Sequence, residues 1–435
     1  MAVADQTLTE EAVREAARRI EGRVRMTPVL PAGELSRRVG SRVVLKAENL
    51  QLTGSFKLRG AYNTISRLPD EALRAGVVAA SAGNHAQAVA FAARGAGARA
   101  TLLMPANAPL AKVAAVRQYG GEVRLVEGSY DEAGAAAARL AADERRPLVH
   151  PFDTPEVVAG QGTVGLEIAE QAPDARTVVV PLGGGGLASG VAVALASRGV
   201  RVVGVQAEAC APYPASIAAH HPLVLGEPPD GGSPIPVARS ANTICDGIAV
   251  KRPGDFTLPL VERYLDEVVT VSDDEVAQAM VLLLERSKLV VEGAGAVGVA
   301  ALMHDRVRVE GEVCAVLSGG NVDASLLSEC IRMGETAAER RMVLATVVPD
   351  RPGALAGLLR VVADAGANIV DVEHLREGLD LHVRETAVQL VLQTRGPDHG
   401  REIAEAVEAE GFSVRVEPRP RRPQATDRPP APPIP

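Results

Sequence analysis

Between residues 76 and 206 the chain alternates short apolar runs with segments of helical spacing, and this alternation constrains its fold more than any other feature. The apolar runs occupy residues 77–81, 100–104, 122–126, 177–182 and 201–206, and helical segments occupy residues 86–94, 112–119, 131–143 and 187–197. Strands that alternate with helices form βα units and a mostly parallel sheet covered on both faces. Aromatic residues make up only 2% of the chain, so Ala, Val and Leu must build this core. The sequence therefore predicts an α/β fold.

After Asn321 the pattern changes to a smaller unit. Strands are predicted at residues 342–348, 368–375, 385–393 and 412–416, and helices begin near Leu355 and at residues 401–410. The order βαββαβ is that of the ferredoxin-like split βαβ unit. We therefore predict a larger α/β domain over residues 1–330 with a smaller subdomain inserted at about 50–150. A linker at 331–341, a ferredoxin-like domain at 342–417 and a disordered Pro- and Arg-rich tail at 418–435 are predicted to follow.

Charge and hydropathy exclude several classes of protein. The formal net charge is −8 and the pI is about 5.6, which argues against a nucleic-acid partner. The segment Thr177–Ser197 carries no charge, yet it contains Pro181 and four consecutive glycines, so a strand, a loop and a helix are predicted instead of a membrane span. No signal peptide is visible in residues 1–19, and we expect a cytoplasmic protein.

The four cysteines and two capping boxes make further local predictions. The spacing of the cysteines fits neither a zinc site nor a disulfide framework, so buried thiols are expected at Cys210, Cys245, Cys314 and Cys330. Thr7 with Glu10, and Ser272 with Glu275, each have the spacing of a capping box and predict helix starts.

The segment Thr53–Ala61 (TGSFKLRGA) contains a lysine directly after an aromatic residue. Lysines are rare in this chain and occur at Lys46, Lys57, Lys112, Lys251 and Lys288. At the junction of a loop and a helix, the Lys57 amine could condense with an aldehyde cofactor to form a Schiff base. Taken alone, the segment is more simply interpreted as a surface lysine at a helix start.

Two further loops suit anions because each follows a strand and opens a helix. Ser81–His85 could hold a substrate carboxylate on helix-start amides, or it could be an ordinary turn with Ser81 as the N-cap. Gly183–Gly186 exposes successive N–H groups suited to a phosphate. Because Gly183, Gly185 and Ala188 also match the dinucleotide fingerprint, an NAD-dependent oxidoreductase is the alternative at this point.

Taken together and in order, these segments resemble the threonine dehydratase and serine racemase group of pyridoxal-phosphate enzymes of fold type II, over about residues 5–330. The resemblance is carried by Glu48–Lys57, by the loops described above, by Asp246–Val250 and by the small-residue turns at 291–296 and 317–321. The last domain resembles an ACT domain through residues 349–353 and 365–369. The resemblance implies two Rossmann-like α/β subdomains followed by a ferredoxin-like ACT domain.

The resemblance also implies a cofactor, roles for individual residues and a reaction. The cofactor would be pyridoxal 5'-phosphate, bound by Phe56, Lys57, Asn84, Gly183, Gly184, Gly185, Gly186, Leu187 and Ser318. Of these, Lys57 would be catalytic, Asn84 would bond the ring hydroxyl, the glycines would cradle the phosphate and Ser318 would meet the pyridine nitrogen. The substrate carboxylate would be held by Ser81, Ala82, Gly83 and His85. The expected reaction converts L-threonine to 2-oxobutanoate and ammonia, with L-serine to pyruvate as a side activity.

For the ACT domain, the resemblance implies regulation by a small amino acid. We expect a branched-chain amino acid to bind near Asp350, Gly353 and Asn368, at an interface of a homotetramer or homodimer. Two alternatives stay open: a serine or 3-hydroxyaspartate dehydratase on the same scaffold, and a catalytically silent amino-acid sensor. The intact Lys57 argues against the sensor.

Two departures from the racemase pattern narrow the expected chemistry. Racemases of this group carry a serine where this chain has Ala82, which cannot move a proton, so racemisation should be minor. They also bind a divalent cation through paired acids, whereas no second carboxylate closely follows Glu208. We therefore expect no divalent metal site, while a monovalent cation stays possible.

Overall fold

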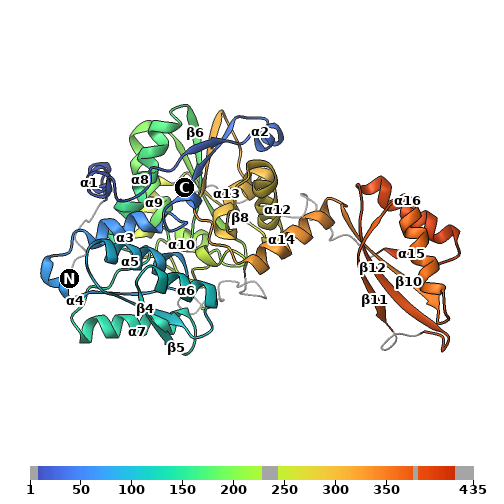
Figure 1. The fold of residues 1–435 in the computed structure, drawn as a ribbon. Coiled ribbons are helices and arrows are strands. Elements are labelled where there is room, and N and C mark those ends of the chain that lie inside the picture. The colour runs from blue at the N-terminus through green and yellow to red at the C-terminus, as the bar shows by residue number, and fades with distance from the viewer. Residues whose placement is uncertain (1–7, 228–242, 376–380, 417–435) are drawn as a thin grey trace. The chain divides into compact units, whose positions relative to one another are not determined.

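The structure is a computed structural model that describes residues 8–227, 243–375 and 381–416 (Figure 1). The chain separates into two compact units, the first ending at Ala324 and the second beginning at Ser325. Among the described residues, the first unit contains two sheets and the second unit one, and each unit has its own hydrophobic core.

The larger sheet of the first unit contains six strands in the order β1-β2-β9-β6-β7-β8. The strands are β1 (Val29–Pro31), β2 (Val43–Ala47), β6 (Ala175–Pro181), β7 (Arg201–Ala207), β8 (Glu267–Val271) and β9 (Glu312–Leu317). All neighbours pair in parallel except β1 and β2. Every residue of β2 is buried, as expected for a parallel strand covered on both faces. The uncharged segment Thr177–Ser197 forms the predicted strand, loop and helix.

Helices and short helical turns pack around this sheet. The helices are α1 (Glu10–Ile20), α2 (Gly33–Val39), α8 (Pro155–Gln171), α9 (Gly186–Leu195), α10 (Tyr213–Ala219), α11 (Thr257–Tyr264), α12 (Asp273–Leu282) and α13 (Gly293–Met303). The turns are η1 (Glu48–Leu50), η2 (Ala196–Arg198), η3 (Asp246–Ile248) and η4 (Leu283–Ser287). A Cβ on Gly190 would lie 2.5 Å from the Val158 carbonyl oxygen, so α8 and α9 approach as closely as glycine permits.

A smaller parallel sheet of the first unit has the order β3-β4-β5. Its strands are β3 (Val77–Ala80), β4 (Ala100–Pro105) and β5 (Glu122–Val126). The helices of this part are α3 (Lys57–Ile65), α4 (Asp70–Ala75), α5 (Asn84–Gly95), α6 (Leu110–Gln118) and α7 (Tyr130–Asp143). The strands that the sequence predicts here are confirmed to within one residue at each end.

The second unit contains α14 (Ala324–Ala337), β10 (Arg341–Pro349), α15 (Ala354–Asp364), β11 (Asn368–Leu375), β12 (Glu385–Gln393), α16 (Pro397–Ala409) and β13 (Arg415–Val416). Its antiparallel sheet has the order β11-β12-β10-β13, which is the ferredoxin-like arrangement. Both α15 and α16 cover the same face of this sheet (Figure 1). Alternate residues of β10 are buried, as expected for a sheet covered on one face only.

The structure differs from the predicted elements at several places. The first helix is capped by Thr9, whose side chain accepts a hydrogen bond from Ala12 N, while Thr7 lies outside the described residues. No helix was predicted at α8, because it is buried on almost every side and has no polar face to reveal its period. The expected linker 331–341 includes the end of α14, and the expected strand 412–416 shortens to β13. The predicted capping box at Ser272 and Glu275 is confirmed.

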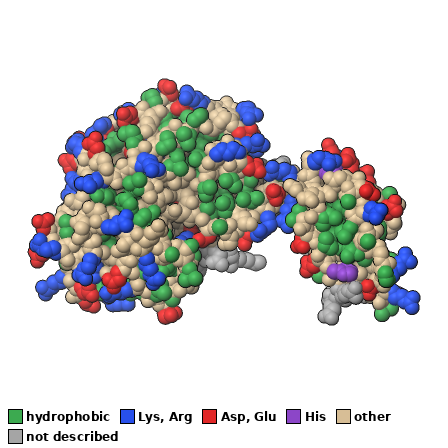
Figure 2. Space-filling view, viewed as in Figure 1, with side chains coloured by type: hydrophobic (Ala, Val, Ile, Leu, Met, Phe, Trp, Pro, Cys, Tyr) green, Lys and Arg blue, Asp and Glu red, His purple; other side chains and the backbone are tan. Residues whose placement is uncertain are grey.

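The surface mixes charges of both signs. On the face shown in Figure 2, lysine and arginine side chains alternate with acidic ones and with apolar groups on each unit. No helix within the described part of the chain is both long and apolar enough to cross a membrane.

Candidate active site

The first unit encloses a cavity of about 1150 Å³ at the carboxyl ends of strands from both of its sheets. Its wall includes Ala80 at the end of β3, Pro181 at the end of β6 and Ser318 just after β9. In open α/β sheets, ligands bind at this edge. The cavity is also lined by the predicted cofactor and substrate residues Phe56, Lys57, Ser81, Ala82, Gly83, Asn84, His85, Gly183, Gly184, Gly185, Gly186 and Leu187. The predicted regulatory residues Asp350, Gly353 and Asn368 belong to the second unit.

Lys57 is the first residue of α3, as its position between a loop and a helix predicts. Its Nζ donates a hydrogen bond to the Pro151 carbonyl at 2.9 Å and lies 5.2 Å from the centre of the Phe56 ring. Burial lowers the pKa of this amine to about 8, against an opposing effect of the nearby Glu292 carboxylate. About a tenth of the amine is therefore unprotonated at pH 7, far more than for an ordinary lysine, and this is the form that a nucleophile or base requires.

A buried ionic cluster fixes α3 behind this lysine. The Arg59 side chain is fully buried and donates to both carboxylate oxygens of Glu48, at 2.7 and 2.8 Å. It also donates to both carboxylate oxygens of Glu167 in α8, at 2.6 and 2.9 Å. Two forked contacts from one guanidinium define the orientation of the helix as well as its position.

The loop Ser81–His85 opens α5 without a side-chain cap. The N-cap residue is Gly83, whose N–H donates to the Ser81 hydroxyl at 3.1 Å, so the alternative of Ser81 as the N-cap is wrong. The absence of a capping side chain leaves the first amides of α5 available to an anion. His85 Nε2 bonds the Val149 carbonyl at 2.8 Å, and burial lowers its pKa to about 3, so this ring is neutral.

Asn84 is held between two side chains. Its amide nitrogen donates to Glu292 Oε1 at 2.7 Å, and its amide oxygen accepts from Asn321 Nδ2 at 2.7 Å. Glu292 is buried in the cavity wall, and burial with the nearby Asp246 raises its pKa to about 7. The sequence patterns assigned no role to Glu292. One sequence feature could have indicated a role for Glu292. It is the N-cap residue of the apolar helix α13, and glutamate is not a preferred N-cap residue.

The tetraglycine loop leaves no space for side chains. Gly185 has φ +96°, and a Cβ there would overlap the Tyr213 hydroxyl. A Cβ on Gly184 would lie 2.5 Å from the Phe152 ring. The loop ends at Gly186, the first residue of α9, which also has no side-chain cap. Backbone amides at a helix start that is closed to side chains suit a phosphate group.

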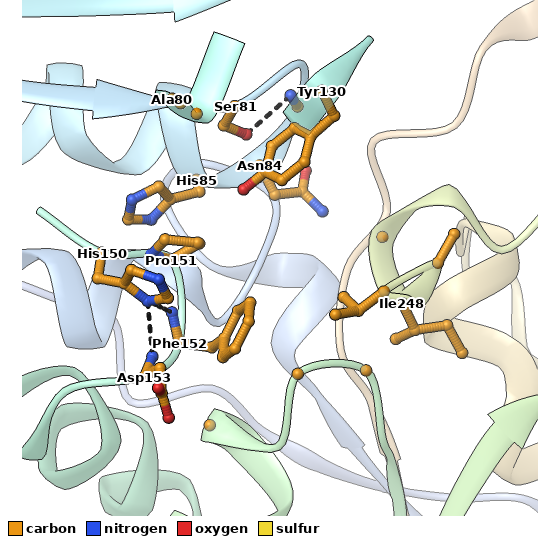
Figure 3. Close-up of a pocket in the computed structure, with 18 of the residues that line it drawn as sticks. Ala80, Ser81, Asn84, His85, Tyr130, His150, Pro151, Phe152, Asp153 and Ile248 are labelled. Carbon is orange, nitrogen blue, oxygen red and sulfur yellow. Dashed lines mark hydrogen bonds between the residues drawn. The ribbon is translucent and has the colours of Figure 1, made fainter. Parts of the chain in front are cut away.

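Further residues of the cavity were not predicted as site residues, among them Tyr130, His150, Phe152 and Ile248 (Figure 3).

Two ion pairs join the part of the first unit that contains the smaller sheet to the part that contains the larger sheet. Lys112 in α6 contacts Asp246 at 2.6 Å, and Lys251 contacts Asp131 in α7 at 2.9 Å. Such pairs contribute little stability where they are exposed, and these two connect opposite walls of the cavity.

Ser318 completes the set of cavity residues that could meet a cofactor. Within the described part of the chain, its hydroxyl donates a single long hydrogen bond, of 3.4 Å, to the Ala294 carbonyl. A hydroxyl that is buried and weakly bonded is available to a ligand atom.

Comparison with known proteins agrees with this geometry. The family model for pyridoxal-phosphate dependent enzymes matches residues 20–319, and the ACT domain model matches residues 342–409. An L-threonine ammonia-lyase of Thermotoga maritima is 45% identical over 413 residues, covering 94% of this chain and 99% of that protein. The catabolic L-threonine dehydratase TdcB of Escherichia coli is 41% identical over 320 residues, covering 72% of this chain and 93% of its own length.

Solved structures give the same assignment. A threonine deaminase from T.th. is 37% identical, with a TM-score of 0.66, covering 72% of this chain and 99% of that chain. Maize serine racemase is 35% identical, with a TM-score of 0.67, covering 74% of this chain and 97% of that chain. The chain therefore belongs to the pyridoxal-phosphate dependent enzymes, in the threonine ammonia-lyase group, and carries a C-terminal ACT domain.

Proposed function

We propose that the protein is an L-threonine ammonia-lyase that converts L-threonine to 2-oxobutanoate and ammonia, with L-serine to pyruvate as a side activity. The observation that carries the proposal is Lys57, whose buried amine lies in the cavity of a chain similar over nearly its full length to named L-threonine ammonia-lyases. The NAD-dependent alternative does not account for this lysine.

Pyridoxal 5'-phosphate fits the residues of the cavity. Lys57 would hold its aldehyde carbon, Gly183–Gly186 and Leu187 its phosphate, Asn84 its ring hydroxyl and Ser318 its ring nitrogen, with Phe56 beside the ring. When bound, the cofactor supplies an electron sink for the charge that develops at the substrate Cα. A neutral hydroxyl opposite the ring nitrogen makes that sink a modest one, which favours prompt loss of the β-hydroxyl over transamination.

The residues of the chain then have separate roles in the reaction. The first amides of α5, at the positive end of the helix, hold the substrate carboxylate. The Lys57 amine takes the Cα proton, and the Pro151 carbonyl orients that amine beforehand. His85, with a pKa far below neutral, holds its place in the loop through Val149 and moves no proton. Ala82 offers no proton donor for the opposite face of the substrate, so elimination exceeds racemisation.

A steady-state comparison of L-threonine, L-serine and 3-hydroxyaspartate, with ammonia release as the readout, tests the assignment. We expect the highest kcat/KM for L-threonine. A higher kcat/KM for either other substrate would assign the scaffold to that dehydratase instead. Chiral chromatography should find only minor D-amino acid, and the variant Ala82→Ser should raise its share.

For the second unit, we propose that a branched-chain amino acid binds near Asp350, Gly353 and Asn368 and regulates a homotetramer. Among the described strands, β11 lies at the edge of its sheet and leaves Val370 58% exposed. Pairing two copies along this edge would cover it. Gly353, at the start of α15, has φ +90° and open space around it, which suits a backbone approach to a small ligand.

We also propose the cytoplasm as the compartment. All four cysteines are free and buried, which is the usual state of thiols in a reducing compartment. Fractionation of the source cells with an antibody to the protein tests this directly.

A further inference from the structure

The tautomer of one cavity histidine can be derived from its hydrogen bonds. His150 Nδ1 accepts a hydrogen bond from Asp153 N at 2.8 Å and a longer one from Phe152 N at 3.3 Å (Figure 3). A nitrogen that accepts cannot carry the ring proton, so a neutral His150 carries it on Nε2. Burial lowers the pKa of this ring; the Asp153 carboxylate opposes that shift and Lys57 reinforces it. The ring therefore stays neutral near pH 7 and is an Nε2–H donor.

The turn that fixes His150 is itself held rigidly. The Asp153 carboxylate accepts hydrogen bonds from Asp255 N, Phe256 N and Thr257 N, all at 3.0 Å, at the start of α11. The His150 ring also packs edge-on against Phe152, with centroids 4.9 Å apart and an interplanar angle of 79°. The direction of the Nε2–H bond is thus set before any ligand arrives.

The second histidine of the cavity has the same tautomer, but its N–H is already bonded. His85 Nε2 faces the Val149 carbonyl at 2.8 Å, and since a carbonyl only accepts, this nitrogen carries the proton. His85 thus uses its only N–H within the protein. Among the described residues, no group bonds His150 Nε2. Of the two rings, only His150 has an N–H left for a ligand.

The position of His150 relates this donor to the reacting centre. The residue lines the cavity, and the next carbonyl along the chain, that of Pro151, accepts the hydrogen bond from Lys57 Nζ. Figure 3 shows His150 on the Phe152 side of the pocket, apart from Ser81 and Tyr130. In the proposed binding mode, the substrate carboxylate lies on the Ser81–His85 loop and its Cα lies at Lys57. Other residues of the cavity must then recognise the substrate side chain.

We propose that the His150 Nε2–H donates a hydrogen bond to the β-hydroxyl oxygen of the substrate. The inference rests on the proposed function, because it requires a β-hydroxy amino acid. Negative charge develops on this oxygen as the Cβ–O bond breaks, and a fixed hydrogen-bond donor stabilises such charge. A neutral imidazole is too weak an acid to give up its N–H proton, so His150 transfers no proton and acts by hydrogen bonding alone. A neutral imidazole is known to act in this way in other enzymes. The hydroxyl leaves as water, taking the proton that Lys57 removes from Cα.

Two substitutions at the same position separate the donor from the turn. In His150→Asn the amide oxygen can take the place of Nδ1 and accept the backbone N–H groups, but no donor reaches the position of Nε2. In His150→Gln an amide nitrogen reaches the position of Nε2, while the acceptor of the turn is lost. The pair thus removes one function of the ring at a time.

Each variant should be measured as holoenzyme with L-threonine, L-serine and β-chloro-L-alanine, whose chloride leaves without needing a hydrogen-bond donor. We expect His150→Asn to lose about 10²-fold in kcat/KM for the hydroxy substrates, mostly in kcat, as when one donor to a developing oxyanion is removed. Elimination from β-chloro-L-alanine and the dissociation constant of pyridoxal phosphate should change far less. His150→Gln should recover much of the loss.

Other outcomes would overturn the inference. An equal loss with the chloro and hydroxy substrates would assign His150 to the support of Lys57, and a selective loss of pyridoxal-phosphate affinity would assign its donor to the cofactor. An unchanged kcat/KM in His150→Asn would exclude any role of the donor. If the wild type turned over β-chloro-L-alanine but no β-hydroxy amino acid, both this inference and the proposed function would fall. If it preferred L-serine, only the proposed substrate would change.

Discussion

The central strands of the first unit's larger sheet and the edge strand β11 of the second unit differ in burial, and this difference bears on how each unit can carry function. In the first unit, strands such as β2 are buried along their whole length, and the side chains of the cavity gather at the carboxyl edge of the sheets. In the second unit, β11 is mostly exposed and lies at the edge of a sheet covered on one face. The first unit therefore holds a complete set of reactive side chains, whereas the second offers a backbone edge and a helix start.

The same contrast appears at two glycines of nearly equal backbone conformation. Gly185 in the cavity and Gly353 in the second unit have φ of +96° and +90°. A Cβ on Gly185 would overlap the Tyr213 hydroxyl, whereas nothing lies within 4 Å of a Cβ on Gly353. The cavity is thus shaped by packing from several elements, and the helix start of the second unit is open.

The largest expected effect comes from removing the cavity amine. Lys57→Ala should lower kcat/KM for L-threonine by at least about 10³-fold, since it removes both the cofactor attachment and the base. The near-visible absorbance band of the wild type, which borohydride should abolish, should be missing. Lys288→Ala, at an exposed lysine of the same unit, is the control and should retain activity. Ammonia release by Lys57→Ala at the wild-type rate would contradict the mechanism.

The glycine pair tests whether packing distinguishes the two units. Both Gly185→Ala and Gly353→Ala place a side chain at positive φ, which costs about 1–3 kcal/mol of stability at either position. Overlap with Tyr213 should add about 1–3 kcal/mol at Gly185 only. We therefore expect Gly185→Ala to lose pyridoxal-phosphate affinity and melting temperature, and Gly353→Ala to keep its cofactor. An equal loss of pyridoxal-phosphate affinity in both variants would show that packing around the glycine does not distinguish the two units.

The residues that the sequence predicted for the site line one cavity because they lie at element ends. Strands β5, β11 and β12 match the predicted residues at both ends, since alternation or continuous apolarity marks them directly. Glu292 and His150 were not predicted as site residues because their positions depend on contacts with residues far away in the chain. Glu292 accepts a hydrogen bond from Asn84, and the turn that orients His150 is held by backbone N–H groups at the start of α11. Such roles come from tertiary packing and leave no local pattern in the sequence.

The buried amine also gives the first unit a pH dependence. With burial lowering the pKa of Lys57 to about 8, only about 1% of the amine is unprotonated at pH 6 and about half at pH 8. Because the unprotonated form attacks the aldehyde, the rate at which the apoprotein takes up pyridoxal phosphate should rise about 50-fold over that range and level off above it. Stopped-flow absorbance measures this rate. A midpoint near the ordinary lysine value of about 10.4 would show that the amine is not desolvated as described.

The smallest effect on turnover is expected from removing the second unit's sheet together with α15 and α16. A chain ending at Arg341 should keep its near-visible band and a basal kcat for L-threonine close to that of the full chain, because the cavity is built by the first unit alone. A relative of that size exists, since the E. coli dehydratase is covered over 93% of its length by 72% of this chain.

The same truncated chain should lose the response of its rate and melting temperature to isoleucine or valine, and it should lose subunits, as measured by sedimentation. An effector can bias the assembly only if it binds one arrangement better than another, so the response and the assembly should disappear together. If none of the twenty amino acids changes the rate or melting temperature of the full-length protein, the second unit acts in assembly alone. If the truncated chain still responds, the effector site lies in the first unit.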